Sequence, residues 1–166
     1  MAFTYSKLAE VTLASTTSTI DFINIPQNYN DLIIKLSLRS DTNSVEGLLV
    51  NINGSSSNFT GRFVDGGAGT PRSGTAVVNG IVNGTDYTAS TFSSNEIYIP
   101  NYTSSNFKSY SVDYVTENNA SAGYNGFSAL LWSNVTAITS LSFRRASSGS
   151  FVQYSTATLY GVKAEV

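Results

Sequence analysis

The segment Asp31-Leu-Ile-Ile-Lys-Leu-Ser-Leu-Arg39 decides the fold class of this chain. Leucine or isoleucine occupies positions 32, 34, 36 and 38, and the alternate positions hold Lys35, Ser37 and Arg39. Successive side chains of a β-strand point to opposite faces of the sheet, so this order places the apolar residues on one face and the polar residues on the other. The segment therefore predicts a strand with one face in the core, as is typical of antiparallel sheets.

Similar runs recur along the chain at intervals of about ten to fifteen residues, which is the spacing of β-sandwiches and barrels. Clusters of Gly, Ser, Asn and Thr separate them, and no stretch repeats its apolar residues with the helical period. We therefore expect an all-β fold, an antiparallel β-sandwich in the form of a jelly roll of about eight to ten strands, in a single domain spanning residues 1–166. Further strands are expected at 11–13, 20–25, 48–52, 59–64, 76–82, 96–100, 110–115, 127–132, 141–145 and 157–163, with Asn-Gly or Ser-Gly turns at 53–54, 79–80, 83–84, 125–126 and 148–149.

Three short segments stand outside the repeated pattern. The glycine-rich residues 65–72 predict an exposed loop. Residues 41–46 offer three side-chain oxygen ligands between two strands, which fits either a calcium site or an ordinary turn, and the missing glycine of a calcium loop favours the turn. Arg144 and Arg145 are neighbours on one strand and so point apart, which predicts one surface charge and one charge at the rim of the sheet.

The composition excludes several classes of protein. The chain has 166 residues without His or Cys, which removes imidazole bases, thiol nucleophiles, disulfides and the common zinc sites, and we expect no cofactor. Only 12% of the residues are charged and the formal net charge is -2, which argues against a nucleic-acid partner. The first residues lack the pattern of a secretory signal and no run reaches the ~18 apolar residues of a membrane span, so we expect no membrane insertion.

An enzymatic function would need a cluster of catalytic groups. Asp113 and Glu117 are four residues apart on an expected strand and so share a face. At about 3.3 Å per residue their separation exceeds the usual spacing of paired catalytic carboxylates. We therefore expect a protein that is not an enzyme, with these carboxylates on a solvated sheet face.

Aromatic residues provide candidates for a binding surface. Tyr98, Tyr102 and Tyr124 lie near expected loops, where their rings could stack on a glycan. Packing in the core or in a subunit interface is the alternative for the aromatic residues as a group, and it is favoured for Tyr110 and Trp132, which share a strand face or a run with apolar residues.

The chain has few means of blocking association through its sheet edges. It has three prolines and few charges, the residues with which edge strands usually resist pairing with other chains. Association with further copies would cover such edges. The candidate interface residues are Phe3 and Tyr5 in an N-terminal arm, and Ile33 on the outward face of its strand.

Several segments carry a family resemblance. Residues 20–22, 25–32 (Ile-Pro-Gln-Asn-Tyr-Asn-Asp-Leu) and 38–40 resemble the opening of a group of tailed-bacteriophage virion proteins. Residues 50–54 (Val-Asn-Ile-Asn-Gly) and 158–163 (Thr-Leu-Tyr-Gly-Val-Lys) are similar to the same group, whereas residues 55–156 carry no motif that aligns.

The resemblance implies a noncatalytic β-sandwich protein on the outer surface of a virion, made in the host cytoplasm. Its expected role is a capsid decoration or cement protein that stabilises capsomer contacts, with the major capsid protein or other virion proteins as partners. The alternative is a tail fibre or tail appendage subunit that contacts host surface glycans. By analogy with the group, the chain is expected to form a homotrimer.

Overall fold

The structure is a computed structural model that describes residues 3–67, 70–119 and 123–164. The described residues form twelve strands and no helix. Within them there is accordingly no apolar helix long enough to cross a membrane. The strands are β1 (Phe3–Thr12), β2 (Thr19–Phe22), β3 (Asp31–Leu38), β4 (Glu46–Ile52), β5 (Phe59–Gly67), β6 (Thr70–Gly74), β7 (Ile81–Val82), β8 (Ser93–Ile99), β9 (Lys108–Glu117), β10 (Gly123–Trp132), β11 (Leu141–Arg145) and β12 (Thr156–Ala164).

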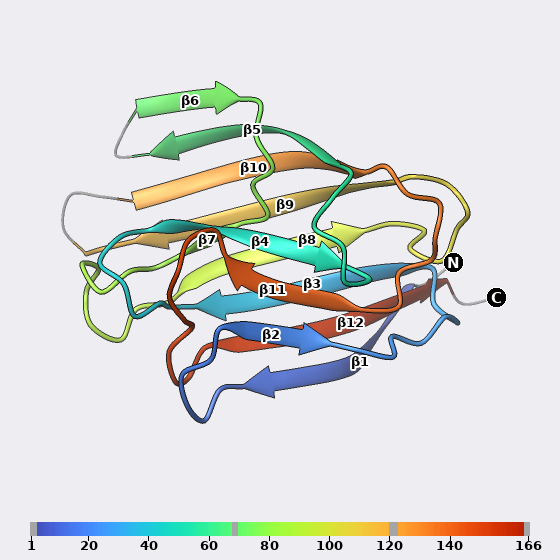
Figure 1. Cartoon of the computed structure of the whole chain (residues 1–166), viewed down its shortest axis with the longest axis horizontal. Helices are drawn as coiled ribbons and strands as arrows, with labels where there is room; N and C mark the ends of the chain where they lie inside the picture. Colours follow the sequence, from blue (N-terminus) through green and yellow to red (C-terminus); the bar gives the residue numbers. More distant parts are fainter. Residues whose placement is uncertain (1–2, 68–69, 120–122, 165–166) are drawn as a thin grey trace.

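The strands form two sheets that pack face to face as a β-sandwich (Figure 1). The large sheet has eight strands in the order β1-β12-β3-β8-β9-β10-β5-β6, and the small sheet has four in the order β2-β11-β4-β7. All the strand pairs of the described residues are antiparallel. The all-β antiparallel sandwich expected from the sequence is confirmed.

The core lies between the two sheets, and β3 shows how the sequence pattern builds it. Leu32, Ile34, Leu36 and Leu38 are all buried, as their alternation predicts. They belong to one continuous hydrophobic cluster that also contains residues of the small sheet. Burying one side chain of this size stabilises the folded state by about 1.5–3 kcal/mol.

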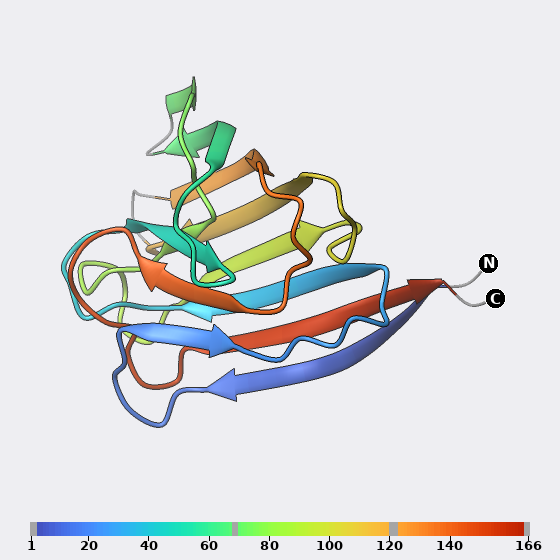
Figure 2. The same ribbon diagram turned by 45° about the vertical axis from the view of Figure 1, so that its right-hand side comes forward.

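The small sheet covers only part of the large one. Figure 2 shows β10, β5 and β6 extending beyond it. The segment that connects β6 to β7 crosses the inner face of β5 and β10, in the area that the small sheet does not cover. A β-carbon on Gly61 would lie 2.4 Å from the carbonyl oxygen of Ala76 and 2.5 Å from Leu130 Cδ2. The absence of a side chain at Gly61 therefore lets this connection lie against the sheet.

The structure corrects several details of the expected strands. Residues 65–72 are not a loop over their whole length, because 65–67 end β5 and 70–72 begin β6, the two strands of a hairpin. Of the expected strand 76–82, only Ile81 and Val82 form a strand, β7. Asn79 and Gly80 form backbone hydrogen bonds with Leu48 on β4, and the residues before them connect across β5. The expected strand 11–13 is the end of β1, which begins at Phe3.

Candidate functional site

A groove of about 820 Å³ lies on the outer face of the large sheet, the face turned away from the small sheet. It runs across β6, β5, β10, β9 and β8. Its volume lies in the range of small-molecule sites, about 300–1,000 Å³. We call it the outer groove. It is lined by Val64, Asp65, Gly66, Pro71, Arg72, Ser73, Ser94, Glu96, Asp113, Tyr114, Val115, Asn125, Gly126 and Phe127.

Strand register explains which side chains meet in the outer groove. Glu96, Asp113, Phe127, Val64 and Ser73 lie directly opposite one another on β8, β9, β10, β5 and β6. Paired residues of antiparallel strands point to the same face, about 4.5–5.5 Å apart, so these five side chains form one row across the sheet. The row changes from two carboxylates at β8 and β9 to two apolar side chains at β10 and β5.

A second row lies beside the first and deepens the groove. Ser94, Val115 and Asn125 are opposite one another on β8, β9 and β10, and Pro71 lies opposite Gly66 on the other side of the groove. Gly66 has no side chain, and a β-carbon there would come within 3.0 Å of Asn125 Oδ1. This part of the sheet is consequently hollow rather than filled.

The floor of the outer groove is apolar and exposed. The side chains of Val64, Val115 and Phe127 are 56%, 49% and 43% exposed. Val64 and Phe127 are a direct cross-strand pair, and Val115 follows two residues after Asp113 on the same face of β9. Single exposed apolar residues are ordinary on a protein surface, but three adjoining ones in a hollow form a surface that a ligand or partner can cover.

The acidic end of the groove carries one unneutralised charge. Glu96 forms an ion pair with Lys35 on β3, with Lys35 Nζ 2.9 Å from Glu96 Oε2, and this hydrogen bond raises the pKa of Lys35. Asp113 has no hydrogen-bond or ion-pair partner within the described ranges and is exposed. An ionised carboxylate only accepts hydrogen bonds, so Asp113 is available to a donor.

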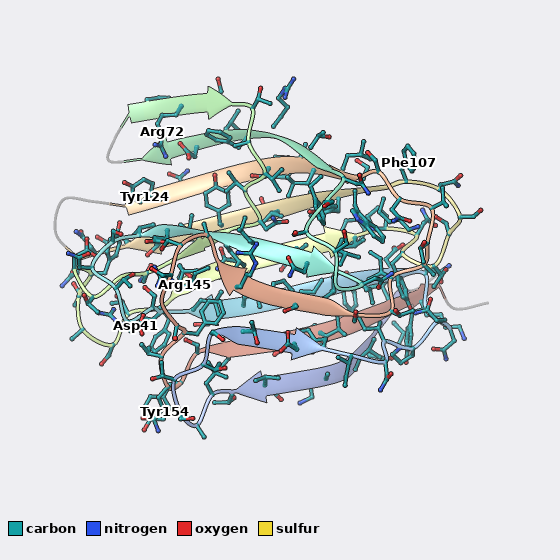
Figure 3. The ribbon with its side chains drawn as sticks, in the orientation of Figure 1. Asp41, Arg72, Phe107, Tyr124, Arg145 and Tyr154 are labelled. Carbon is teal, nitrogen blue, oxygen red and sulfur yellow. The ribbon has the colours of Figure 1, made fainter. Side chains whose placement is uncertain are left out.

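The charges behind the opposite end of the groove, on the inner face of the sheet, balance each other. Arg72 on β6 donates two hydrogen bonds of 2.8 Å to the carboxylate of Asp65 on β5, and its guanidinium lies 5.7 Å from the ring centre of Tyr124. Figure 3 shows Arg72 and Tyr124 together beyond the edge of the small sheet. Burial raises the pKa of Tyr114 to about 12, and the negative charge of the nearby Asp65 carboxylate is the second cause of this increase. The charge of Arg72 is thus already satisfied within the protein.

The three tyrosines proposed from the sequence as glycan contacts do not form a platform. Tyr102 is completely buried and its hydroxyl donates a hydrogen bond to the carbonyl of Pro26, so the expectation of a glycan contact there is wrong. Tyr98 lies on the outer face but donates its hydroxyl to Asp31 Oδ2 at 2.9 Å. Tyr124 packs partly against the core beside Arg72. None of the three lines the outer groove.

The candidate interface residues also need correction. Ile33 is on the outward face as expected, but it is only 7% exposed, because it lies between Tyr98 on β8 and Tyr160 on β12. Phe3 and Tyr5 do not belong to a free arm, since both lie in β1, which pairs with β12 along its length. Tyr5 is 62% exposed and remains a candidate, whereas the side chain of Phe3 lies outside the described part of the structure.

The possible calcium site at residues 41–46 is occupied by a protein cation. Arg145 is fully buried; its Nη2 lies 3.0 Å from Glu46 Oε1 and its Nη1 lies 3.6 Å from Asp41 Oδ1. It also donates hydrogen bonds of 2.5 Å to Thr42 Oγ1 and 2.9 Å to the carbonyl of Ser148. Arg145 is therefore not a rim charge, and the ordinary-turn alternative fits this segment. Among the described residues no group of three or more acidic side chains is placed to hold a metal ion.

Sequence reasoning missed the residues that define the outer groove. It paired Asp113 with Glu117 along one strand, whereas the carboxylate opposite Asp113 is that of Glu96 on the neighbouring strand. Phe127 was recognised only as part of a strand. The sole sequence signal for an exposed Phe127 is its position in β10, out of phase with the inward Leu130 and Trp132.

Comparison with known proteins gives no relative that could assign the groove a function. No protein-family model matches the chain, and no curated protein or solved structure matches it either.

Proposed function

We propose that the chain is a noncatalytic structural protein of a bacteriophage virion, a capsid decoration protein that sits on the outer head surface and stabilises capsomer contacts. The segments that resemble virion proteins support this role. They fall mainly on β2, β3, β4 and β12, and β12 pairs directly with β3 in the large sheet. The resemblance therefore concerns the part of the fold where the two sheets meet.

The observation that carries the proposal is the edge strand β1. It has ten residues, and β12 is its one strand neighbour among the described residues, so β1 forms an edge of the large sheet. Its charged side chains Lys7 and Glu10 neutralise each other at 2.6 Å. Soluble monomers usually block such an edge with charges, prolines, β-bulges or a covering segment, and β1 has one register shift between Lys7 and Ala9 but no proline. A long and weakly charged edge fits a subunit that is covered by other subunits.

In this role the protein is made in the host cytoplasm and assembles as a homotrimer on the virion surface. The β1 edges and exposed Tyr5 side chains provide contacts between subunits, and the major capsid protein provides the surface on which they dock. Interfaces of this kind gain stability from buried apolar area and from backbone hydrogen bonds between edges.

Native mass measured by light scattering after size exclusion tests the proposal. The expected mass over a wide range of protein concentration is about three times 17.7 kDa. Tyr5→Lys adds a charge to the β1 edge and should lower this mass, whereas Phe107→Lys, at an exposed site before β9, should not change it. A single-chain mass at every concentration, or equal effects of the two variants, would overturn the proposal.

A second candidate function is a tail appendage subunit that contacts glycans. The outer groove favours it, because an exposed apolar floor there adjoins Asp113, whose carboxylate has no partner among the described residues.

A further inference from the structure

We propose that the outer groove is a binding site for a neutral oligosaccharide, centred on Phe127 and Asp113. The inference deepens the second candidate function, a subunit that contacts glycans, and does not rest on the capsid role. It follows from the combination of an apolar floor, hydrogen-bonding side chains and a hollow of suitable volume on one sheet face.

The apolar floor matches one side of a sugar ring. A pyranose presents carbon-bound hydrogens on its faces and hydroxyl groups around its rim. Phe127 and Val64 are adjacent across β10 and β5 and leave about half of their side-chain surface exposed, which gives a ring face a surface to cover. Aromatic rings attract the partly positive edges of such groups to their electron-rich faces.

The polar groups around the floor match the hydroxyl rim. Asp113 accepts hydrogen bonds and has no partner within the described parts of the chain. Asn125 has an amide that both donates and accepts, and the Ser73 and Ser94 hydroxyls do the same. A sugar hydroxyl is donor and acceptor at once, so it can bond to each of these groups. Hydrogen bonds to an ionised group contribute about 1.5–3 kcal/mol, more than those between neutral groups.

The charges of the groove select against charged sugars. Asp113 and Glu96 lie side by side at one end and repel an anionic residue. Arg72, the cation among the lining residues, is bound to Asp65 by two hydrogen bonds on the inner face of the sheet, so it offers little to an anion in the groove. Glu96 is already paired with Lys35, so of the two carboxylates only that of Asp113 has no partner in the described part of the chain. One exposed ion pair contributes about 0–1 kcal/mol, too little to hold a basic peptide by itself.

The shape of the site also favours an oligosaccharide over a flat protein partner. The groove extends across five strands, and Gly66 leaves its centre open beside Asn125. Its volume of about 820 Å³ accommodates a short chain of sugar rings. A flat interface between folded proteins would leave this hollow unfilled.

An array of neutral glucose-, galactose- and mannose-containing oligosaccharides tests the inference directly. The oligosaccharide with the strongest signal is then titrated into isotope-labelled protein, and the backbone amide shifts are followed by NMR. Shifts are expected at residues 64–66, 71–73, 94–96, 113–115 and 125–127. Asp113→Asn and Phe127→Ala should each weaken binding by about tenfold or more.

Matched variants show whether such losses are specific. Asp21→Asn changes an exposed carboxylate on the small sheet, and Phe107→Ala removes an exposed ring outside the groove, so both should bind as the original chain does. Urea unfolding of each variant shows whether it remains folded. The inference is overturned if no neutral oligosaccharide binds, if the shifts lie elsewhere, or if the groove and control variants bind equally. Binding of a lysine-rich peptide alone, or a change of native mass in Phe127→Ala, would assign the groove to a protein partner or a second copy instead.

Discussion

Replacing the buried Arg145 by methionine should destabilise the protein strongly. The guanidinium lies between the turn at residues 41–46 and the segment that follows β11, and Figure 3 shows Arg145 and Asp41 at the same end of the sandwich. Its partners are the carboxylates of Asp41 and Glu46, the hydroxyl of Thr42 and the carbonyl of Ser148. Methionine fills a similar volume but offers none of these hydrogen bonds.

The size of the stability loss depends on how much hydration the partners of Arg145 regain when the guanidinium is removed. Removing one member of a buried ion pair costs about 3–5 kcal/mol when the other stays buried. The side chains of Asp41 and Glu46 are 42% and 19% exposed and so recover part of their hydration. We therefore expect the lower limit, a loss of about 3 kcal/mol in the free energy of unfolding and a fall in Tm of about 6–12 °C.

Urea unfolding followed by the fluorescence of Trp132 measures this loss, because Trp132 is the only tryptophan and is buried. Arg145→Lys keeps the charge but reaches fewer partners, so its free energy of unfolding should lie between those of the original chain and Arg145→Met. Arg144→Met is the control, since the Arg144 side chain makes one weak hydrogen bond of 3.4 Å to the carbonyl of Arg145. If Arg145→Met is as stable as the original chain, the desolvation cost of burying the guanidinium cancels the free energy of its hydrogen bonds and ion pairs. That result would refute the reasoning.

Two further predictions concern the sheet face and the connection across it. Burial raises the pKa of Tyr98 and Tyr114 to about 12 from the model-compound value of 10.0, so the stability that depends on their neutral phenols is complete below pH 10.0 and lost as the pH rises through about 12. Urea midpoints and phenolate absorbance should change together in that range, and a constant midpoint would contradict the assignment. Gly61→Ala should cost about 1–3 kcal/mol, because its β-carbon meets the Ala76 carbonyl at 2.4 Å. Gly47→Ala, whose nearest contact would be 3.7 Å away, should unfold at the original urea midpoint, and equal losses would argue against the crossing connection as the cause.

Local signals in the sequence were sufficient for much of the fold. The alternation over residues 32–38 predicted both the strand β3 and the face that it buries. The pair Asn53-Gly54 predicted a tight turn after β4, and both residues adopt positive φ, 51° and 75°. These features depend on residues close together in the chain, which is why the sequence alone could indicate them.

The same signals failed where distant residues determine the local structure. Asn125-Gly126 was expected to form a turn but lies within β10. Gly126 is there to accommodate the ring of Tyr114, which a β-carbon would approach to 2.4 Å. β6 has the composition of a loop, Thr-Pro-Arg-Ser-Gly, and is a strand because β5 pairs with it.

The candidate site was beyond prediction for a related reason. Glu96 and Asp113 meet only because β8 and β9 pair in a particular register, and no local pattern encodes that register. Tyr102 looked accessible from its loop position, yet it packs into the hydrophobic core, and its hydroxyl donates a hydrogen bond to the carbonyl of Pro26, far away in the sequence. Which side chains share a face could be estimated from the sequence, but which strands are neighbours could not.

The position of β12 has a consequence for how the protein folds during synthesis. The last strand of the chain lies between the first strand, β1, and β3, and Phe3 is paired with Ala164. β1 therefore has no partner in its own sheet until the ribosome has made and released β12. Such pairing between distant segments closes large loops and is intrinsically slow. While the residues between β1 and β12 are made, β1 stays unpaired, and in this interval it can associate with other copies or bind a chaperone.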